Sequence, residues 1–269
     1  MDDRVKVTMS DGVADVRLVR ADKMNALDAA MFDALVATSG RLAHEKGLRA
    51  VVLSGEGRAF CAGLDMDRFA AMKKGGNRVA GGESRDLTAR THGLTNFPQQ
   101  AVWGWRQLPV PVIAAIQGVA FGGGFQLALG ADMRFLAPDA RMSIMEIKWG
   151  LVPDMAGTPI LANLVRDDIL RELTYTGRIF SAQEALSYGL ATRICDDPRA
   201  AAFEVAREIA GKSPEAIRAA KRMLNNLTVD PGPALLAESV EQMKLMGGAN
   251  QLEAVRANID KRAPRFVDV

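Results

Sequence analysis

Cysteine and histidine are scarce in this chain of 269 residues, and each shortage excludes a class of protein. Two cysteines, Cys61 and Cys195, cannot form a disulfide framework, and neither belongs to a Cys-x-x-Cys motif. The simplest interpretation is a reducing compartment, so we expect a cytoplasmic protein. The two histidines, His44 and His92, form no cluster that indicates a metal site, and we expect no bound metal.

The chain also lacks an excess of charge and a long apolar run. Its 34 basic and 32 acidic residues give a net charge of +2, which indicates neither a nucleic-acid partner nor attraction to an anionic membrane. No apolar run reaches the roughly 18 to 20 residues that a membrane-spanning helix needs. The segment Met1–Ser10 is too polar for a secretory signal. We therefore expect no nucleic-acid and no membrane partner.

What is present is the composition of a globular protein with a sizeable core, 48% hydrophobic and 25% charged. Val5–Met9 and Val13–Val19 alternate between apolar and polar residues on either side of Asp11-Gly12, which predicts a β-hairpin. Helical periodicity follows over Asp28–Glu45. Arg49–Ser54 is β-branched and apolar, which predicts a buried strand.

The rest of the chain divides into an α/β part and a helical part. The pattern weakens from Asp65 to Gln107, where we predict a helix over Asp65–Met72 and a loop over 73–85. From about Thr158 onward the chain is predicted to be almost wholly helical. We therefore predict an α/β core over residues 1–195 and a helical C-terminal region over 196–269. Further strands are predicted at Pro111–Ile116, Asp132–Leu136 and Arg141–Ile147, and helix starts at Ser181 and near Pro214, Pro233 and Asn250.

Two glycine-containing turns are candidates for anion binding. Gly122-Gly123-Gly124 lies between a strand and the helical run Phe125–Gly130, where free amides and the positive end of the helix dipole suit an oxyanion. A second such turn, Arg58–Asp65, follows the Arg49–Ser54 strand. Each turn could offer one amide to a single oxygen. Tight packing of a helix on a strand explains the glycines equally well.

These segments, in this order, resemble the enoyl-CoA hydratase/isomerase family, also called the crotonase family. The resemblance implies a spiral of ββα units forming two roughly perpendicular sheets, with a helical C-terminal trimerisation region. It also implies a homo-trimer, often paired into a hexamer. The matching segments are Lys23–Leu27, Ala59–Asp65, Pro111–Gly118, Gly122–Gly124, Ala131–Arg134, Gly150–Pro153, Leu173–Arg178 and Ala182–Ala185 with Gly189-Leu190.

The resemblance assigns roles to five further positions. The amides of Leu64 and Gly123 match the oxyanion hole that holds a thioester oxygen in the family. Lys23 and Ala62 match positions near the CoA moiety, and Lys261 matches a lysine that contacts CoA phosphate in some relatives, sometimes across subunits. For both lysines, a solvated surface charge is the alternative. CoA belongs to the substrate, so no separate cofactor is expected.

The chain departs from the hydratase pattern at one position. Family hydratases carry two glutamates twenty residues apart; here the second is Glu146 and the first position holds Gln126. An amide cannot accept a proton from water, although it can orient substrate or water by hydrogen bonding. A proton shuttle by Glu146 alone is still feasible. Apolar neighbours such as Met145 and Trp149 are expected to raise its pKa.

Asp154, eight residues after Glu146, is a second candidate acid. Dienoyl-CoA isomerases of the family carry an acidic residue at this position, and in the family's 4-chlorobenzoyl-CoA dehalogenase it is the nucleophile. The dehalogenase also needs a histidine, which has no compelling match here. The alternative is a helix-capping aspartate beside Ala156–Thr158.

The sequence therefore predicts an acyl-CoA enzyme with Glu146 as its acid–base. Isomerisation of an enoyl- or dienoyl-CoA double bond is placed slightly ahead of hydration, because Gln126 removes one carboxyl. A non-catalytic acyl-CoA-binding protein, thioester hydrolysis and dehalogenation remain alternatives. No Gly-x-Ser-x-Gly motif supports a serine-hydrolase site, and Cys61 is a weak candidate nucleophile.

Overall fold

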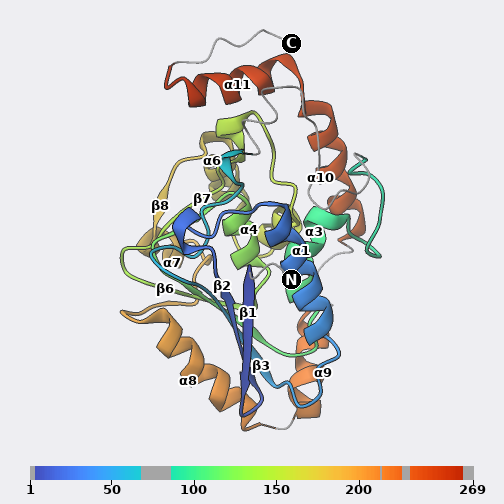
Figure 1. Ribbon diagram of the computed structural model, residues 1–269, viewed down its shortest axis with the longest axis vertical. Coiled ribbons are helices and arrows are strands. Elements are labelled where there is room, and N and C mark those ends of the chain that lie inside the picture. Colours follow the sequence, from blue (N-terminus) through green and yellow to red (C-terminus); the bar gives the residue numbers. More distant parts are fainter. Residues whose placement is uncertain (1–3, 68–85, 213, 226–230, 263–269) are drawn as a thin grey trace.

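The chain begins with the hairpin that Asp11-Gly12 predicts, in a computed structural model that describes residues 4–67, 86–212, 214–225 and 231–262. Strands β1 (Val5–Ser10) and β2 (Val13–Leu18) pair antiparallel, from Val5 against Leu18 to Ser10 against Val13. Asp11 and Gly12 both have positive φ, as a two-residue hairpin turn requires. The hairpin is the edge of the main sheet (Figure 1).

The main sheet has six strands in the order β1-β2-β3-β4-β6-β9. All pairs after the hairpin are parallel, so the strands end at a common edge, where loops can converge. β3 and β4 are buried along their whole length, which explains why they are continuous apolar runs. The added strands are β3 (Ala50–Gly55), β4 (Val112–Ile116), β6 (Met133–Leu136) and β9 (Arg193–Ile194).

Helices cover both faces of this sheet. On one face, α8 (Pro198–Ala210) packs Ala202 and Ala206 against β3, β4 and β6. On the other, α1 (Ala29–Leu42) and α3 (Phe97–Gln107) pack on each other in the larger core. α1 begins where predicted, because Asp28 accepts a hydrogen bond from the Met31 amide at 2.8 Å.

A second, three-stranded sheet confirms the two-sheet architecture. It consists of β5 (Val119–Phe121), β7 (Arg141–Ser143) and β8 (Phe180–Ser181) in that order. The strand predicted over Arg141–Ile147 is wrong beyond Ser143, because β5 offers β7 only three pairing residues. The chain then turns into the 3₁₀ helix η2 (Glu146–Trp149), and the Leu151 amide donates back to the Glu146 carbonyl.

The second half of the chain is mostly helical, as predicted. The Ser181–Glu184 capping box opens α7, and helices begin at Pro214 and near Pro233 and Asn250. The short strands β8 and β9 and the helix α3 were not predicted. The remaining helices are η1 (Ala21–Lys23), α4 (Gly123–Leu129), α5 (Gly157–Leu161), α6 (Asp167–Thr176), α7 (Ala182–Ser187), α9 (Pro214–Asn225), α10 (Gly232–Leu245) and α11 (Ala249–Ile259).

The C-terminal helices occupy two ends of the molecule. α8 lies beside the main sheet at one end, whereas α10 and α11 lie together at the other, beyond the loops that follow the parallel strands (Figure 1). Because α8 packs directly on the sheet, the boundary at residue 195 stays a prediction. The helix predicted over Asp65–Met72 and the loop over 73–85 lie, from residue 68 on, outside the described residues.

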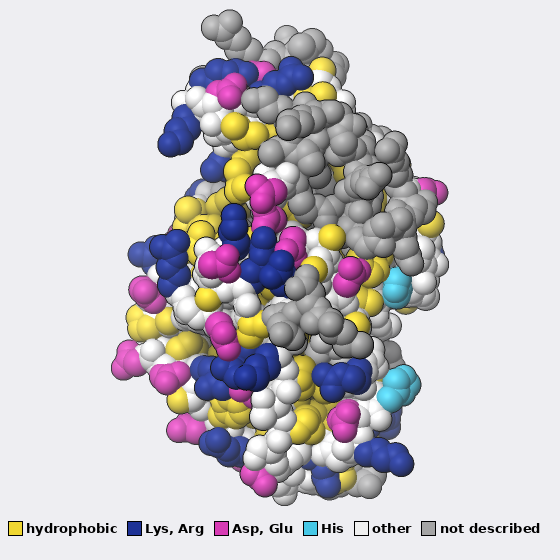
Figure 2. All heavy atoms as spheres, in the orientation of Figure 1, with side chains coloured by type: hydrophobic (Ala, Val, Ile, Leu, Met, Phe, Trp, Pro, Cys, Tyr) yellow, Lys and Arg dark blue, Asp and Glu magenta, His cyan; other side chains and the backbone are white. Residues whose placement is uncertain are grey.

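Basic and acidic side chains are interspersed over the face drawn in Figure 2, rather than gathered in one field. None of the helices in the described part of the chain is both long and apolar enough to cross a membrane.

Candidate active site

One cavity of about 600 Å³ lies where the loops after the parallel strands meet η2 and α10. Its wall is mainly apolar, with few polar groups, which is typical of a small-molecule site. Six of the predicted site residues line it, namely Lys23, Ala62, Leu64, Gly123, Glu146 and Asp154. The other lining residues include Met24, Leu27, Phe32, Met66, Leu87, Pro98, Phe121, Met145, Trp149, Leu151, Met155, Ile179, Gln242 and Met246.

The two glycine-containing turns lie side by side in one wall of this cavity. The Cys61 amide donates to the Val119 carbonyl at 3.0 Å, and the Phe121 amide donates to the Cys61 carbonyl at 3.1 Å. These two bonds form a parallel β-bridge between Cys61 and Ala120. Residues 61–64 and 120–123 are therefore held together by backbone bonds that do not depend on side-chain identity.

Glycine is required where these turns touch. A Cβ built on Gly124 would lie 2.3 Å from the Cys61 carbonyl oxygen, far inside contact distance. Gly63 has φ +90°, and a Cβ there would lie 2.5 Å from the Phe121 carbonyl oxygen and 3.8 Å from the Gly123 nitrogen. The Gly63–Leu64 peptide and the Gly123 amide are thus close neighbours.

The Leu64 and Gly123 amides face no acceptor in the part of the chain that the structure describes. Leu64 pairs with Leu27 in a parallel bridge, but the bonds of that bridge join Leu27 to Gly63 and Asp65. Gly123 is the first residue of α4, where backbone amides have no partner within the helix. Two neighbouring donors that line a cavity without a protein acceptor can bind one oxygen of a ligand.

A cluster of polar side chains, namely Arg20, Asn25 and Asp65, holds the turn that carries Leu64 in place. Asn25, with φ +55°, donates to the Glu56 and Ala59 carbonyls at 3.0 and 2.9 Å. Arg20 pairs with the buried carboxylate of Asp65 and also donates to the Ala26 carbonyl at 3.0 Å. Breaking a buried pair leaves an uncompensated charge, so this cluster fixes the turn strongly.

Glu146 is the buried acid of the cavity. It is the first residue of η2, and its carboxylate faces Gly122, whose Cβ position lies 3.4 Å from Glu146 Oε1. Oε1 accepts a hydrogen bond from Gln126 Nε2 at 2.7 Å. Oε2 is buried and has no hydrogen-bond partner among the described residues. One carboxylate oxygen is therefore committed to the protein and the other is left for a ligand.

The surroundings of Glu146 favour its neutral form. Burial raises the pKa from its ordinary value of 4.5 to about 7, and the charge of Asp154 adds to the rise. Hydrogen bonds from backbone amides and from Gln126 act in the opposite direction but do not cancel it. Near neutral pH, both forms of this carboxyl are populated, so it can accept and donate a proton.

Gln126 lies behind Glu146 and is not among the residues that line the cavity. Its Oε1 accepts from the Met155 and Gly157 amides at 2.9 and 3.0 Å. Because backbone amides are donors, they fix which end of the side-chain amide is oxygen, and Nε2 must face Glu146. The structure thus places Gln126 as a support of Glu146, which differs from the predicted contact with substrate or water.

Asp154 lines the same cavity, close enough for its charge to act on Glu146. It precedes α5 by three residues, and the N-cap of that helix is Ala156, in the left-handed conformation. The N-cap position itself is therefore not Asp154. The structure brings the two candidate acids to one cavity, as the sequence predicted.

The remaining predicted residues divide into two groups. Lys23 and Ala62 line the cavity, whereas Lys261 is exposed in the turn after α11 and is not among the lining residues. Cys61 is buried, its thiol donates to the Asn25 carbonyl, and burial raises its pKa to about 12. A thiol in that state is a poor nucleophile at neutral pH.

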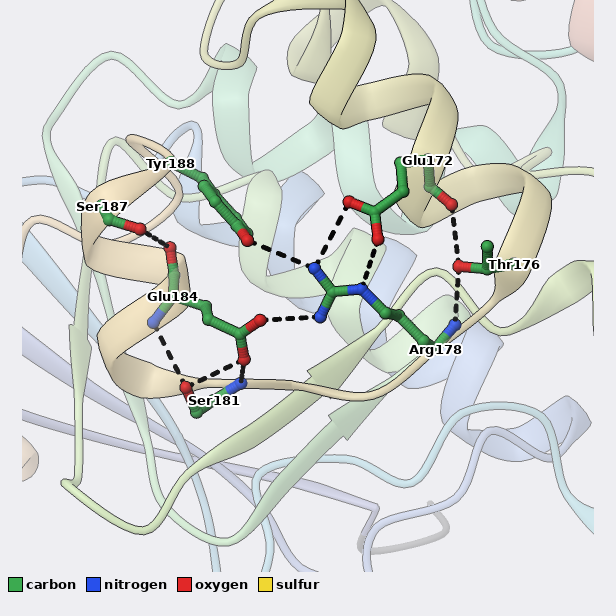
Figure 3. A network of polar contacts seen from close by, with 7 residues as sticks. All are labelled: Glu172, Thr176, Arg178, Ser181, Glu184, Ser187 and Tyr188. Carbon is green, nitrogen blue, oxygen red and sulfur yellow. Dashed lines mark hydrogen bonds and ion pairs between the residues drawn. The ribbon is translucent and has the colours of Figure 1, made fainter.

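Ile179 lines the edge of the cavity, and the residue before it, Arg178, is the centre of an ion-pair network (Figure 3). Arg178 points between two acids, donating to Glu172 at 2.6 Å and to Glu184 at 2.7 Å, and it also contacts Tyr188. Several bonds on one arginine make the network stronger than an isolated surface pair. It fixes the end of α6 against the start of α7, and hence the position of this edge.

Two features of the site were not found from the sequence. Gln242 reaches the cavity from α10, a contact that depends on how the C-terminal helices fold back. The Arg20–Asp65 pair joins residues 45 positions apart. The sequence held a partial signal only for the second, since a charged residue closes the predicted Arg58–Asp65 turn.

Comparison with known proteins points to one family. A family model described as Enoyl-CoA hydratase/isomerase matches residues 8–268. The chain is 32% identical to the carnitinyl-CoA dehydratase of Proteus mirabilis over 99% of both chains. It is 31% identical to the mitochondrial Delta(3,5)-Delta(2,4)-dienoyl-CoA isomerase of Mus musculus, over 95% of this chain and 79% of that protein. A solved enoyl-CoA hydratase from Bacillus anthracis is 31% identical, with a TM-score of 0.73 and 98% of both chains covered.

Proposed function

Because the chain belongs to the enoyl-CoA hydratase/isomerase family, we propose that it moves a double bond along the acyl chain of an enoyl- or dienoyl-CoA. The observation that carries the proposal concerns the two oxygens of Glu146. Oε1 accepts a hydrogen bond from Gln126, and Oε2 has no hydrogen-bond partner among the described residues. A single carboxyl can move a proton from one carbon to another. Hydration in this family uses two carboxyls, and here the second position holds Gln126.

The first proposed step forms an enolate. Glu146, through Oε2, removes a proton from C2 of a 3-enoyl thioester, and the electrons of that C–H bond form a C1–C2 double bond. Negative charge moves to the thioester oxygen, which accepts hydrogen bonds from the Leu64 and Gly123 amides. Donors aimed at a developing charge in a site sheltered from water stabilise the transition state by roughly 3 kcal/mol each.

The second proposed step returns the same proton. The carboxylic acid of Glu146 protonates C4, the enolate collapses, and the double bond forms between C2 and C3. No water is added, the thioester is regenerated unchanged, and no other group is consumed. A pKa of about 7 suits both steps, because neither the base nor its conjugate acid is rare at neutral pH.

Asp154 extends the proposal to dienes. A 3,5-diene requires a proton to travel further along the chain than in a 3-enoyl thioester. A second carboxyl in the same cavity can deliver that proton while Glu146 removes the first. The similarity to a protein named dienoyl-CoA isomerase supports this extension.

Hydration, or dehydration in reverse, is the second candidate. Two relatives about as similar as the isomerase are named carnitinyl-CoA dehydratase and mevalonyl-coenzyme A hydratase, at 32% and 30% identity. In that case Glu146 and Asp154 would have to share the work of activating water and protonating C2. The position of Gln126 argues against it, because its amide is bonded to Glu146 and to backbone amides and does not line the cavity.

The proposal includes how the substrate is held and how the protein assembles. Lys23 and Ala62, in the cavity wall, contact the CoA moiety, and no separate cofactor takes part. Lys261 lies outside the cavity lining of its own chain, so its proposed contact is with CoA phosphate bound to a neighbouring subunit. The proposed assembly is therefore a homo-trimer or hexamer.

The test compares three substrates with wild-type protein, Glu146→Gln and Asp154→Asn. Crotonyl-CoA, a 3-enoyl-CoA and a 3,5-dienoyl-CoA are incubated separately, with mass spectrometry for addition of water and ultraviolet absorbance for conjugation. The expected result is a change of conjugation without a change of mass, lost in Glu146→Gln. Asp154→Asn is expected to slow the diene much more than the 3-enoyl thioester. Addition of water to crotonyl-CoA as the dominant activity would contradict the isomerase assignment.

A further inference from the structure

One face of α10 covers the cavity. Leu235, Ser239, Gln242 and Met246 recur at spacings of four, three and four residues, which places them on one side of a helix. Leu235 and Ser239 are fully buried, and the latter accepts hydrogen bonds from Asn96 at 2.7 Å and from another side chain. The last two residues of this face, Gln242 and Met246, line the cavity itself.

Gln242 is a buried amide in a mostly apolar wall, with only 5% of its surface exposed. Its Oε1 accepts a hydrogen bond from the Val152 amide at 3.4 Å. Since Val152 N–H can only donate, the oxygen of the side chain must face it, and the NH₂ group must point elsewhere. The orientation of this amide is therefore fixed by chemistry.

The NH₂ group of Gln242 is left for a ligand. Within the described residues, the side chain has no other hydrogen bond than the long one from Val152. Gln242 lines the cavity, so this donor can meet an acceptor on a bound ligand. Such a group in a cavity wall is retained at no cost if the natural ligand carries an acceptor that meets it.

The neighbours of Gln242 indicate which acceptor. Val152 lies two residues before Asp154, so the amide donor and an acidic acceptor belong to one part of the wall. A hydroxyl group can use both, accepting from Gln242 and donating to Asp154. A carboxylate could accept only from the NH₂ group of Gln242, and its negative charge would be repelled by Asp154 and Glu146.

We propose that Gln242 is a specificity-determining residue that selects acyl chains carrying a hydroxyl group over unsubstituted hydrocarbon chains. The proposal rests on the proposed function, since it takes the ligand to be an acyl-CoA held in the same cavity. It adds the substrate class, a hydroxyacyl thioester whose hydroxyl lies beyond the reacting carbons. Of the groups proposed to act on the thioester, only Asp154 takes part in this selection, as the acceptor for the hydroxyl proton.

The test measures binding, so that it does not depend on turnover. Saturated hexanoyl-CoA and its 4-, 5- and 6-hydroxy derivatives are titrated into the protein by calorimetry, because none of them has a double bond to move. For at least one hydroxyl position we expect binding on the order of tenfold tighter than hexanoyl-CoA, the effect of one well-placed hydrogen bond. In Gln242→Leu this preference is expected to disappear, with the affinity for hexanoyl-CoA equal or higher.

Ser239→Ala is the matched control. It removes a hydrogen-bonding group from the same face of α10, one turn earlier, without altering the cavity lining. We expect it to keep the ratio of the two affinities. Equal binding of hydroxy and plain acyl-CoA by the wild type, or an unchanged ratio in Gln242→Leu, would overturn the inference while leaving the proposed function intact. Failure of every CoA ester to bind would instead contradict the proposed function.

Discussion

The two walls of the cavity are built in different ways. The wall that carries Leu64 and Gly123 is held by backbone hydrogen bonds between Cys61, Val119 and Phe121, with glycine required at its contacts. A second wall, on α10, is held by side chains, through contacts such as Gln99 Nε2 to the Leu235 carbonyl at 2.5 Å. One wall depends on main-chain geometry and the other on residue identity.

This difference assigns stabilisation of the reacting thioester to one wall and selection of the acyl chain to the other. Amides that stabilise a developing charge must stay in place, and main-chain pairing holds them whatever the neighbouring side chains are. A wall of side chains on a helix can change its lining residue by residue without moving the reacting groups. We infer that substitutions near the amides alter rate and stability, whereas substitutions on α10 alter the choice of acyl chain.

The largest expected effect is on the rate after Glu146→Gln. Glutamine keeps an oxygen that can accept from Gln126, but it cannot carry the proton. We expect kcat to fall roughly 10³-fold, the range for loss of a general acid–base, with affinity for a saturated acyl-CoA changed little. Steady-state kinetics and calorimetry measure the two quantities. A fall of less than tenfold in kcat would place the acid–base elsewhere.

The pH dependence of stability tests the same carboxyl without substrate. Its pKa is raised by folding from 4.5 to about 7, so between these values the unfolded chain has lost a proton that the folded chain keeps. The contribution of this carboxyl to the free energy of unfolding is therefore complete below pH 4.5. It decreases as the pH rises to 7, by about 3 kcal/mol in all. Urea unfolding of wild type and Glu146→Gln between pH 4.5 and 8 measures it. A difference between the two that does not vary with pH would contradict the raised pKa.

Gly124→Ala and Ser239→Ala compare the walls directly. The alanine Cβ would lie 2.3 Å from the Cys61 carbonyl oxygen, so the two turns must separate. We expect Gly124→Ala to lower the free energy of unfolding by about 2 kcal/mol and also to reduce kcat. Ser239→Ala, on α10, is expected to cost about 1 kcal/mol with kcat unchanged. Unfolding and kinetics of both variants check this, and equal losses of kcat would remove the distinction between the walls.

The smallest expected effect is a shift of the pH profile after Gln126→Glu. The Met155 and Gly157 amides would keep the new carboxyl ionised, and its charge would raise the pKa of Glu146 further. Activity that depends on ionised Glu146 is then expected to need a higher pH, with a rate at pH 7 lower by about tenfold. The dependence of kcat/KM on pH measures the shift. An unmoved profile would mean that Gln126 does not govern Glu146.

The sequence predicted the wall that carries Leu64 and Gly123 better than the wall on α10. Its signals were local: glycines between a strand and a helix, and Glu146 at a fixed distance from Gln126. Those residues are positioned by nearby backbone, so their arrangement can be read from short segments. Gln242 gave no signal, because its place in the cavity depends on how α10 packs against α5 and the loop after η2.

The same reasoning explains the errors in the fold. The two-residue strands β8 and β9 exist only through pairing with distant partners, β7 and β6, and have no alternation of their own. η2 replaced the end of a predicted strand for the same reason, since β5 has no further residue to pair. The missed helix α3 did carry a local signal, the Asn96–Gln99 capping box.

The most direct test of the central claim, a single carboxyl that moves one proton over an enolate, is isotope transfer within one turnover. A 3-enoyl-CoA deuterated at C2 is converted in ordinary water, and mass spectrometry of the conjugated product reports how much deuterium has moved to C4. We predict that a measurable fraction of the label is carried across, because Glu146 is buried and returns the proton it removed before solvent exchanges it. A product that has gained a water molecule, or one that carries no deuterium at C4, would contradict the account.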